Sequence, residues 1–212
     1  MEKNIIYMWN FKPSEKEEFP IKTINDNKKF IENFKIISPN DIEELLDLND
    51  FEDLKELYNL LPHWVSRADL GRLLYIYYNG GFYIDADCLV KKNIDISDNN
   101  CFLFIEKVAN ISRLGPRECK NPDNAVRIAN YCFGTTVKKH PFIKQVIIEC
   151  LNRTKQLCIE EKIKNISKRD ILWLCGPDTI TSVYHDVKSD YNDIKLFNRS
   201  YLRHNCRGSW KR

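Results

Sequence analysis

The chain has 212 residues, of which 43% are hydrophobic and 30% are charged, and its formal net charge is +3. This length is typical of one domain, and the apolar content is enough to bury a core, which argues against a disordered chain. Lys and Arg are interspersed with Asp and Glu, so the charge pattern also argues against a nucleic-acid-binding protein, which gathers basic residues on one face.

The eight cysteines stand singly, without a Cys-x-x-Cys motif or a Cys/His pair at zinc spacing. We therefore expect buried thiols in a reducing compartment and no disulfide framework. Residues 1–11 lack the basic and apolar regions of a secretory signal, and the longest apolar run, residues 73–78, is far below the roughly 20 residues of a membrane span. These features predict a protein without a transmembrane segment, working in the cytoplasm of a bacterium or of a virus-infected cell.

Apolar stretches and helical spacing of apolar residues define the expected elements. In chain order these are a strand at 4–9, a helix at 23–33, a strand at 34–38, helices at 41–61 and 64–79, strands at 82–88, 102–106 and 128–134, a helix at 141–162, a strand at 171–175 and a helix at 178–187. This alternation favours an α/β fold in which helices flank a mostly parallel sheet. Ligands of such sheets bind beyond the carboxyl ends of the strands, so residues that follow strands are the first candidates for a site.

The strand at 82–88 ends in Asp85 and Asp87, two residues apart on an extended chain. Side chains alternate along a strand, so both carboxylates share one side and the apolar side chains between them face the other. Two acids at the mouth of an apolar strand repel each other, and a divalent cation relieves the repulsion; Mg²⁺ and Mn²⁺ take one or two carboxylates together with substrate phosphates. The alternative is a strand end that turns into solvent, where Asp is common.

Asp69 and Arg72 lie three positions apart, on one face of the helix that precedes this strand. An intrahelical salt bridge would explain the pair. In the functional alternative, both side chains point off the helix toward the strand end and meet sugar hydroxyls, and the guanidinium offers its fork to phosphate or hydroxyl groups.

Two stretches carry a resemblance to a known family. Residues 67–75 read Arg-Ala-Asp-Leu-Gly-Arg-Leu-Leu-Tyr, and residues 79–87 read Asn-Gly-Gly-Phe-Tyr-Ile-Asp-Ala-Asp. They resemble the DXD-containing sugar-binding region of retaining glycosyltransferases, such as fungal initiating mannosyltransferases, bacterial capsular polysaccharide transferases and the glucosyltransferase domains of clostridial toxins. Every element of that pattern is present at its spacing.

Two outlying segments extend the resemblance. Residues 5–9, Ile-Ile-Tyr-Met-Trp, are similar to the first strand of the family, whose terminal Trp stacks on the nucleotide base; this places Trp9 in that role. Residues 204–210, His-Asn-Cys-Arg-Gly-Ser-Trp, resemble a C-terminal element in which the His is a metal ligand and the Ser and Trp contact the diphosphate. The resemblance thus implies that His204, Ser209 and Trp210 complete the site.

The resemblance implies one domain, residues 1–212, with a GT-A-like nucleotide-diphospho-sugar transferase fold whose tail, residues 199–212, closes over the donor site. It implies transfer of a sugar, with retention of configuration, from a nucleotide-diphosphate sugar, UDP being our choice of nucleotide, to a glycan or other hydroxyl acceptor, as in polysaccharide biosynthesis. Mn²⁺ or Mg²⁺ would be held by Asp85, Asp87 and His204, and the catalytic group would be Asp85, Asp87, Asp69 and Arg72. The implied substrate contacts are Trp9, Asp69, Arg72, Tyr83, Asp85, Asn130, Ser209 and Trp210.

Two other functions stay open at this point. Haloacid-dehalogenase-like phosphatases also place Asp-x-Asp after an apolar strand, but their motif lies near the N-terminus and needs a later Lys and an acidic pair, for which Asp178 alone is a poor substitute. A non-catalytic nucleotide-sugar-binding module would keep the ligands without turnover. Donor hydrolysis that requires Mn²⁺ separates the transferase from both. The sequence leaves the oligomeric state open.

Overall fold

A computed structural model describes residues 4–12, 18–30, 33–95, 100–108, 126–163 and 165–205. The helices are α1 (Ile21–Asn27), α2 (Pro39–Leu46), α3 (Leu54–Leu60), α4 (Trp64–Asn79), α5 (Pro141–Lys155), α6 (Lys168–Leu174) and α7 (Pro177–Val187). The strands are β1 (Asn4–Met8), β2 (Asn33–Ile37), β3 (Gly81–Ile84), β4 (Cys88–Val90), β5 (Cys101–Val108), β6 (Val126–Thr135), β7 (Ile194–Phe197) and β8 (Leu202–His204). The predicted α/β class is confirmed.

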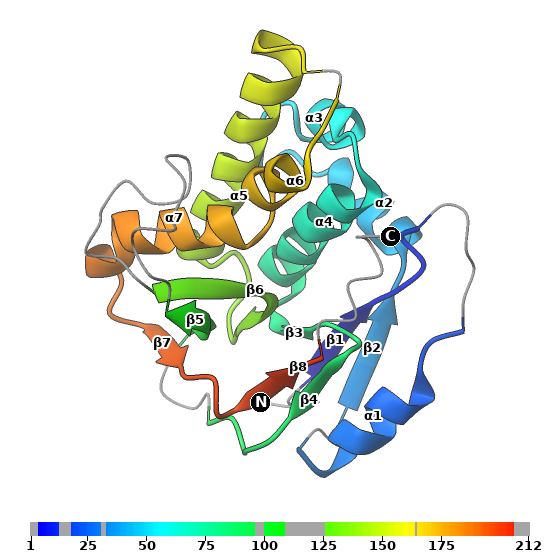
Figure 1. Ribbon diagram of the computed structural model, residues 1–212, viewed down its shortest axis with the longest axis vertical. Coiled ribbons are helices and arrows are strands. Elements are labelled where there is room, and N and C mark those ends of the chain that lie inside the picture. Colours follow the sequence, from blue (N-terminus) through cyan, green and yellow to red (C-terminus); the bar gives the residue numbers. More distant parts are fainter. Residues whose placement is uncertain are drawn as a thin grey trace.

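Six strands form the central sheet in the order β2-β1-β3-β6-β5-β7 (Figure 1). β1 runs parallel to β2 and β3, and β5 runs parallel to β7, whereas β6 is antiparallel to both of its neighbours. Three of the five pairings are therefore parallel, as predicted. The separate β4–β8 pair is antiparallel and sets Cys88 opposite His204.

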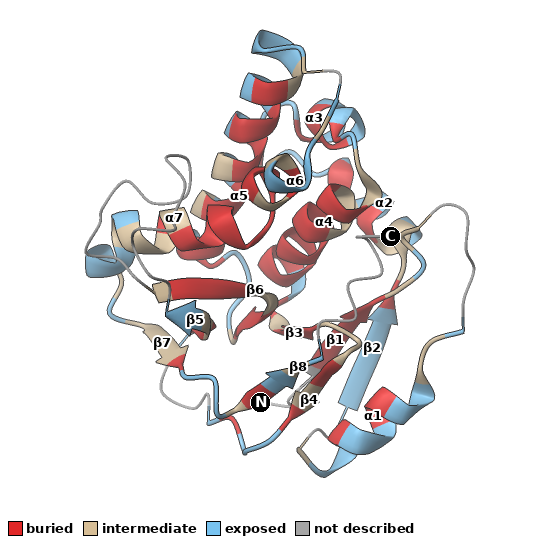
Figure 2. Ribbon diagram, viewed as in Figure 1, coloured by how far each residue is buried: buried red, intermediate tan, exposed pale blue. Residues whose placement is uncertain are grey.

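The sheet separates two hydrophobic cores. Helices α2 to α7 cover one face, and α1 with the β4–β8 pair covers the other (Figure 1). Because side chains alternate along β3, Tyr83 enters the helical core while Phe82 and Ile84 enter the second core. Figure 2 shows the buried residues concentrated on α4 and the central strands. β3, the strand that leads into the Asp-x-Asp segment, is thus packed on both faces.

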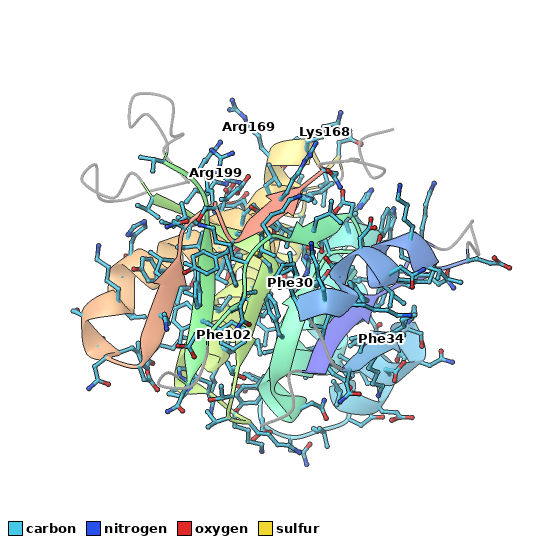
Figure 3. All side chains as sticks on the ribbon, turned by 90° about the horizontal axis from the view of Figure 1, so that it is seen from below. Phe30, Phe34, Phe102, Lys168, Arg169 and Arg199 are labelled. Atoms are coloured by element: carbon cyan, nitrogen blue, oxygen red, sulfur yellow. The ribbon has the colours of Figure 1, made fainter. Side chains whose placement is uncertain are left out.

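The surface of the molecule carries both charged and apolar side chains. Lys168 and Arg169, at the start of α6, point outward in Figure 3, whereas Phe102 lies in the interior. Edge strand β2 leaves Phe34 exposed. Among the described helices none combines the length and the apolar character that a membrane crossing requires. The six cysteines in the described ranges are free thiols, and five of them are buried.

Two predicted elements differ from the structure. The predicted strand at 171–175 is wrong, because these residues lie largely in helix α6. A capping box starts that helix: the Ser167 backbone N–H and hydroxyl both donate to Asp170, and the Asp170 backbone N–H donates back to the Ser167 hydroxyl. The predicted helix at 41–61 is divided into α2 and α3, which are separated by turns at 47–53.

Other predictions fail at the ends of elements. The strand predicted at 82–88 ends at Ile84, and the chain resumes as β4 after a turn. The helix predicted at 141–162 is α-helical to Lys155 and continues as one turn of π-helix, Gln156–Glu160. The short strands β7 and β8 have no counterpart among the predicted elements, because each is only three or four residues long.

Candidate functional site

The Asp-x-Asp segment forms a tight turn between β3 and β4. The Asp85 N–H donates to the Tyr131 carbonyl at 2.8 Å, which anchors the start of the turn to β6, and the Cys88 N–H donates to the Asp85 carbonyl at 2.9 Å, which closes it. The chain is therefore not extended through Asp87, contrary to the prediction, because a turn separates β3 from β4, which leaves the central sheet and pairs with β8. The carboxylates nevertheless converge on one side chain, that of His204.

His204 is supplied by the last described strand, β8. Its Nε2 lies 3.2 Å from Asp87 Oδ1 and 4.0 Å from Asp85 Oδ2. Its ring packs on the Tyr131 ring with 4.1 Å between centroids. Burial lowers the pKa of His204, but the hydrogen bond that its ring donates to Asp87 and the charges of both acids outweigh burial and leave that pKa above its ordinary value. The predicted ligands Asp85, Asp87 and His204 are thus brought together.

The donor set of this cluster fits a divalent cation. Ligand atoms of Asp87, Cys88 and His204 lie within 4.8 Å of one another, with Asp85 alongside. Mn²⁺ and Mg²⁺ favour carboxylate oxygens, and imidazole is also a ligand for many divalent metals. The Cys88 thiol is a less suitable ligand: it is buried in the second core, and burial and the nearby Asp85 carboxylate raise its pKa well above the ordinary range. A lone cysteine carries no signal in the sequence, which is why this neighbour was not predicted.

Arg72 connects helix α4 to the Asp-x-Asp turn. It forms an ion pair with Asp69, and its Nη1 donates to Asp85 Oδ1 at 3.0 Å and to the Asn130 carbonyl at 2.8 Å. Its guanidinium also lies over the Tyr83 ring, 4.9 Å from the centroid. The intrahelical salt bridge and the contact with the strand end, which the sequence presents as alternatives, therefore exist together.

Asp85 is held by two donors from the interior. The buried Tyr83 hydroxyl donates to the same Oδ1 atom that Arg72 contacts. Burial raises the pKa of Asp85, while the charge of Arg72 and the hydrogen bond from Tyr83 oppose that rise. Burial also raises the pKa of this phenol well above its ordinary value, so it stays protonated. Tyr83, predicted as a substrate contact, lies inside the protein and orients Asp85.

A bulge in β6 brings two residues to the site. The β5–β6 register shifts between Leu103 and Ile105, so β6 bulges at the residues opposite. The bulge presents the Asn130 carbonyl to Arg72 and the Tyr131 ring to His204. Asn130 was predicted as a substrate contact; the structure gives its backbone a role. Tyr131 was not predicted, since an aromatic residue in a buried strand looks like core.

The remaining predicted contacts lie at the edges of the described structure. Trp9 directly follows β1, which is parallel to β3, so both strands lead to the same edge of the sheet. The Trp9 ring packs edge-on against Phe19 with 5.2 Å between centroids. Ser209 and Trp210 lie outside the described residues, together with the rest of the tail beyond Asn205, so the closing of the donor site by the tail stays a prediction.

Comparisons with known proteins give a family match over part of the chain and a similar fold. Residues 8–103 match the family described as a glycosyltransferase sugar-binding region containing a DXD motif. The solved PaToxG glycosyltransferase is 19% identical with a TM-score of 0.52, over 89% of this chain and 70% of that chain. The apo structure of the WbbM bifunctional glycosyltransferase is 11% identical with a TM-score of 0.45, over 92% of this chain and 38% of that chain, so the shared fold rests on the former.

No curated protein matches the sequence. The family match covers both Asp69 and Arg72 as well as the Asp-x-Asp turn, and the fold is one found in a glycosyltransferase. Residues 8–103 thus match the sugar-binding region of the DXD-containing glycosyltransferases, and the predicted enzyme class, a glycosyltransferase, is confirmed.

Proposed function

We propose that the protein is a retaining, metal-dependent glycosyltransferase that transfers a sugar from a UDP-sugar to a glycan or other hydroxyl acceptor. The convergence of Asp87 Oδ1 and His204 Nε2 at 3.2 Å, with Asp85 Oδ2 4.0 Å from the same nitrogen, carries the proposal. An imidazole brought from β8 to two carboxylates of the β3–β4 turn supports a site for Mn²⁺ or Mg²⁺.

The leaving group of the reaction is a nucleoside diphosphate, on which negative charge builds as the anomeric C–O bond breaks. A divalent ion bound by Asp85, Asp87 and His204 would act there as a Lewis acid, an effect worth several kcal/mol. The protein side chains hold this arrangement rigid, because Asp85 is fixed by Arg72 and Tyr83. Ser209 and the Trp210 indole would add hydrogen bonds to the diphosphate oxygens.

Arg72 and Asp69 would orient the sugar. Both side chains are buried, and Arg72 reaches the site through Asp85, whose Oδ1 lies 3.0 Å from its Nη1. Asp69 orients this guanidinium through their ion pair. In this proposal Trp9, which follows the parallel strand β1, stacks on the uracil base.

The proposal is tested with a panel of nucleotide sugars. Thermal shift with and without Mn²⁺ identifies the donor, because a ligand bound only by the native state raises the melting temperature. Hydrolysis of that donor is then assayed, and the anomer released first is identified by NMR to test retention. Sugar release that depends on Mn²⁺ supports the proposal. Phosphate release from generic monoesters would indicate the phosphatase, and tight binding without turnover would indicate a binding module.

Asp87→Asn is the decisive variant, because it removes the charge that faces His204 at nearly constant shape. We expect Mn²⁺-dependent turnover to be lost with little change in the melting temperature. Asp50→Asn is the matched control: Asp50 is a partly exposed carboxylate paired with Lys139, whose ammonium group lies over the ring of Tyr78 in the last turn of α4. It should keep full activity. Turnover like that of the wild type in Asp87→Asn would remove Asp87 from the site.

A further inference from the structure

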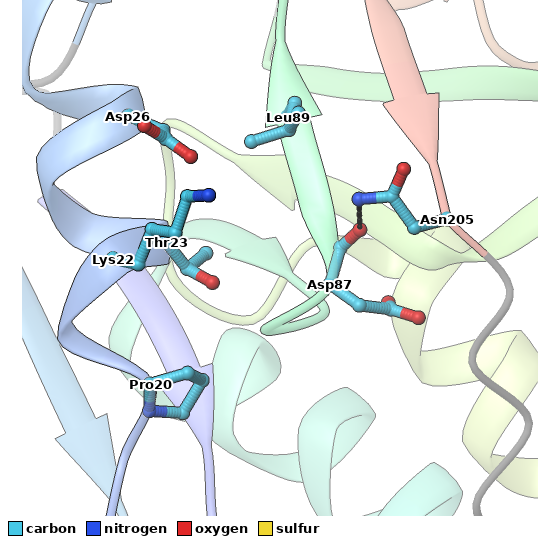
Figure 4. Close-up of a pocket in the computed structure, with 7 residues that line it drawn as sticks. All are labelled: Pro20, Lys22, Thr23, Asp26, Asp87, Leu89 and Asn205. Atoms are coloured by element: carbon cyan, nitrogen blue, oxygen red, sulfur yellow. Dashed lines mark hydrogen bonds between the residues drawn. The ribbon is translucent and has the colours of Figure 1, made fainter.

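Helix α1 packs against the back of the Asp-x-Asp turn. Thr23 and Asn27 are four residues apart and share the helix face that meets this turn. Both are buried although both are polar, and Asn27 has no exposed surface. Figure 4 shows Thr23 on α1 beside the turn, with the Asp87 carboxylate pointing away from the helix. Buried polar side chains need partners, and here the partners belong to the turn and to β4.

Asn27 bonds to β4 much as a neighbouring strand would. Its Nδ2 donates to the Cys88 carbonyl at 3.1 Å, and its Oδ1 accepts from the Val90 N–H at 2.9 Å. The same Nδ2 donates to the Tyr7 hydroxyl at 3.1 Å, which ties the carboxamide to β1. The other edge of β4 pairs with β8, the strand of His204. β4 is therefore fixed on both edges immediately after Asp87.

Thr23 holds the turn itself. Its hydroxyl donates to the carbonyl of Ala86, the residue between the two acids, at 2.6 Å. On the other side of the turn, the Asp87 carbonyl accepts from the Asn205 backbone N–H at 3.1 Å and from its side-chain amide at 2.9 Å. Successive carbonyls of the turn are thus bonded from opposite sides. A turn that carries two like charges would otherwise relax by moving them apart.

We propose that Thr23 and Asn27 are positioning residues that fix the Asp-x-Asp turn in its cation-binding geometry. Thr23 bonds to the Ala86 carbonyl and Asn27 to the backbone of β4, so both act through the backbone next to Asp85 and Asp87. This inference rests on the proposed function, since it concerns the same cation site. Outer contacts of this kind typically change metal affinity about 10–100-fold when they are removed.

The test compares Thr23→Val with Thr23→Ser. Valine keeps the shape and loses the donor, whereas serine keeps the donor. Thr154→Val is the matched control, because Thr154 is a buried threonine on α5 whose hydroxyl donates to the Cys150 carbonyl at 2.8 Å, in the α-helical layer on the far side of the sheet. The dissociation constant for Mn²⁺ alone is measured by electron paramagnetic resonance, and urea unfolding is measured in parallel.

Thr23→Val should raise the dissociation constant for Mn²⁺ at least about tenfold, Thr23→Ser should restore it to within about threefold, and Thr154→Val should leave it unchanged. Equal Mn²⁺ affinity in the wild type and Thr23→Val overturns the inference and leaves the proposed function standing. Absence of Mn²⁺ binding to the wild type overturns both. Asn27→Ala extends the test: if it folds, its Mn²⁺ affinity should fall at least as far as that of Thr23→Val.

Discussion

Replacing Arg72 by methionine removes the cation that lies between Asp69 and Asp85. The side chains of Arg72 and Asp69 are only 8% and 4% exposed, so little water is available to stabilise Asp69 once its partner is gone. Removing one partner of such a buried ion pair typically costs about 3–5 kcal/mol. We therefore expect Arg72→Met to lower the free energy of unfolding by about 3–5 kcal/mol at pH 7, measured by urea denaturation without metal.

The pH dependence of this loss identifies its cause. Burial raises the pKa of Asp85 above the unfolded value, and the charge of Arg72 opposes that rise. A carboxyl with a raised folded-state pKa is protonated first in the folded protein, so it costs stability as the pH rises through that pKa. Without Arg72 the pKa of Asp85 rises further. The loss of unfolding free energy in Arg72→Met should be largest at neutral pH. It should become smaller as the pH falls toward the ordinary aspartate pKa of about 3.9.

Arg153→Met provides the matched control. Arg153 is equally buried, pairs with Glu149 on its own helix, donates to the Trp173 carbonyl at 2.9 Å and lies over the Trp173 ring. Glu149 is 37% exposed, however, and water can stabilise it when Arg153 is lost. This variant should lose stability by an amount that does not narrow on acidification. If the stability loss of Arg72→Met were as independent of pH as that of Arg153→Met, the role of Arg72 as the counter-charge of Asp85 would be refuted.

Two further substitutions test the support of the site and the packing of the sheet. Tyr83→Phe removes the hydroxyl that donates to Asp85. Because a hydrogen bond to a charged group is worth about 1.5–3 kcal/mol, kcat/KM for the identified donor sugar should fall about 10–100-fold in steady-state assays. An unchanged kcat/KM would contradict the role of this hydroxyl. Gly134→Ala sets a methyl group against the Gly81 carbonyl and the Phe102 ring and should cost about 1–3 kcal/mol in thermal unfolding. Gly71→Ala should cost less, because its methyl meets movable side-chain ends; equal losses would contradict this packing.

The parts of the fold that the sequence predicts well are those with long, regular patterns. Helix α4 begins and ends where its apolar stripe and the following glycines indicate. The segment at 171–175 shows the opposite case, because a short apolar run fits a buried helix as well as a strand, and the capping box at Ser167 decides between them. Whether a capping box or a short apolar run determines the local structure depends on the tertiary packing around the segment, which the sequence pattern does not contain.

In the candidate site, too, some residues have a local sequence signal and others have none. Asp85 and Asp87 lie two positions apart in the sequence and carry their own signal. His204 is assigned only through a resemblance, because no local pattern links a residue on β8 to the β3–β4 turn. Thr23 and Asn27 gave no signal, since a threonine and an asparagine on a short helix look like ordinary surface residues until the helix is packed. Residues that support a site through the backbone are the hardest to predict from sequence.

The pairing of β4 with β8 has a consequence for biosynthesis. The carboxylates are made early, but the imidazole that completes the cluster belongs to a strand that leaves the ribosome after the whole central sheet. A nascent or proteolysed chain that lacks β8 would hold the acids without their third partner. In the proposed function, the cation site would therefore receive its third ligand late, when β8 docks against β4.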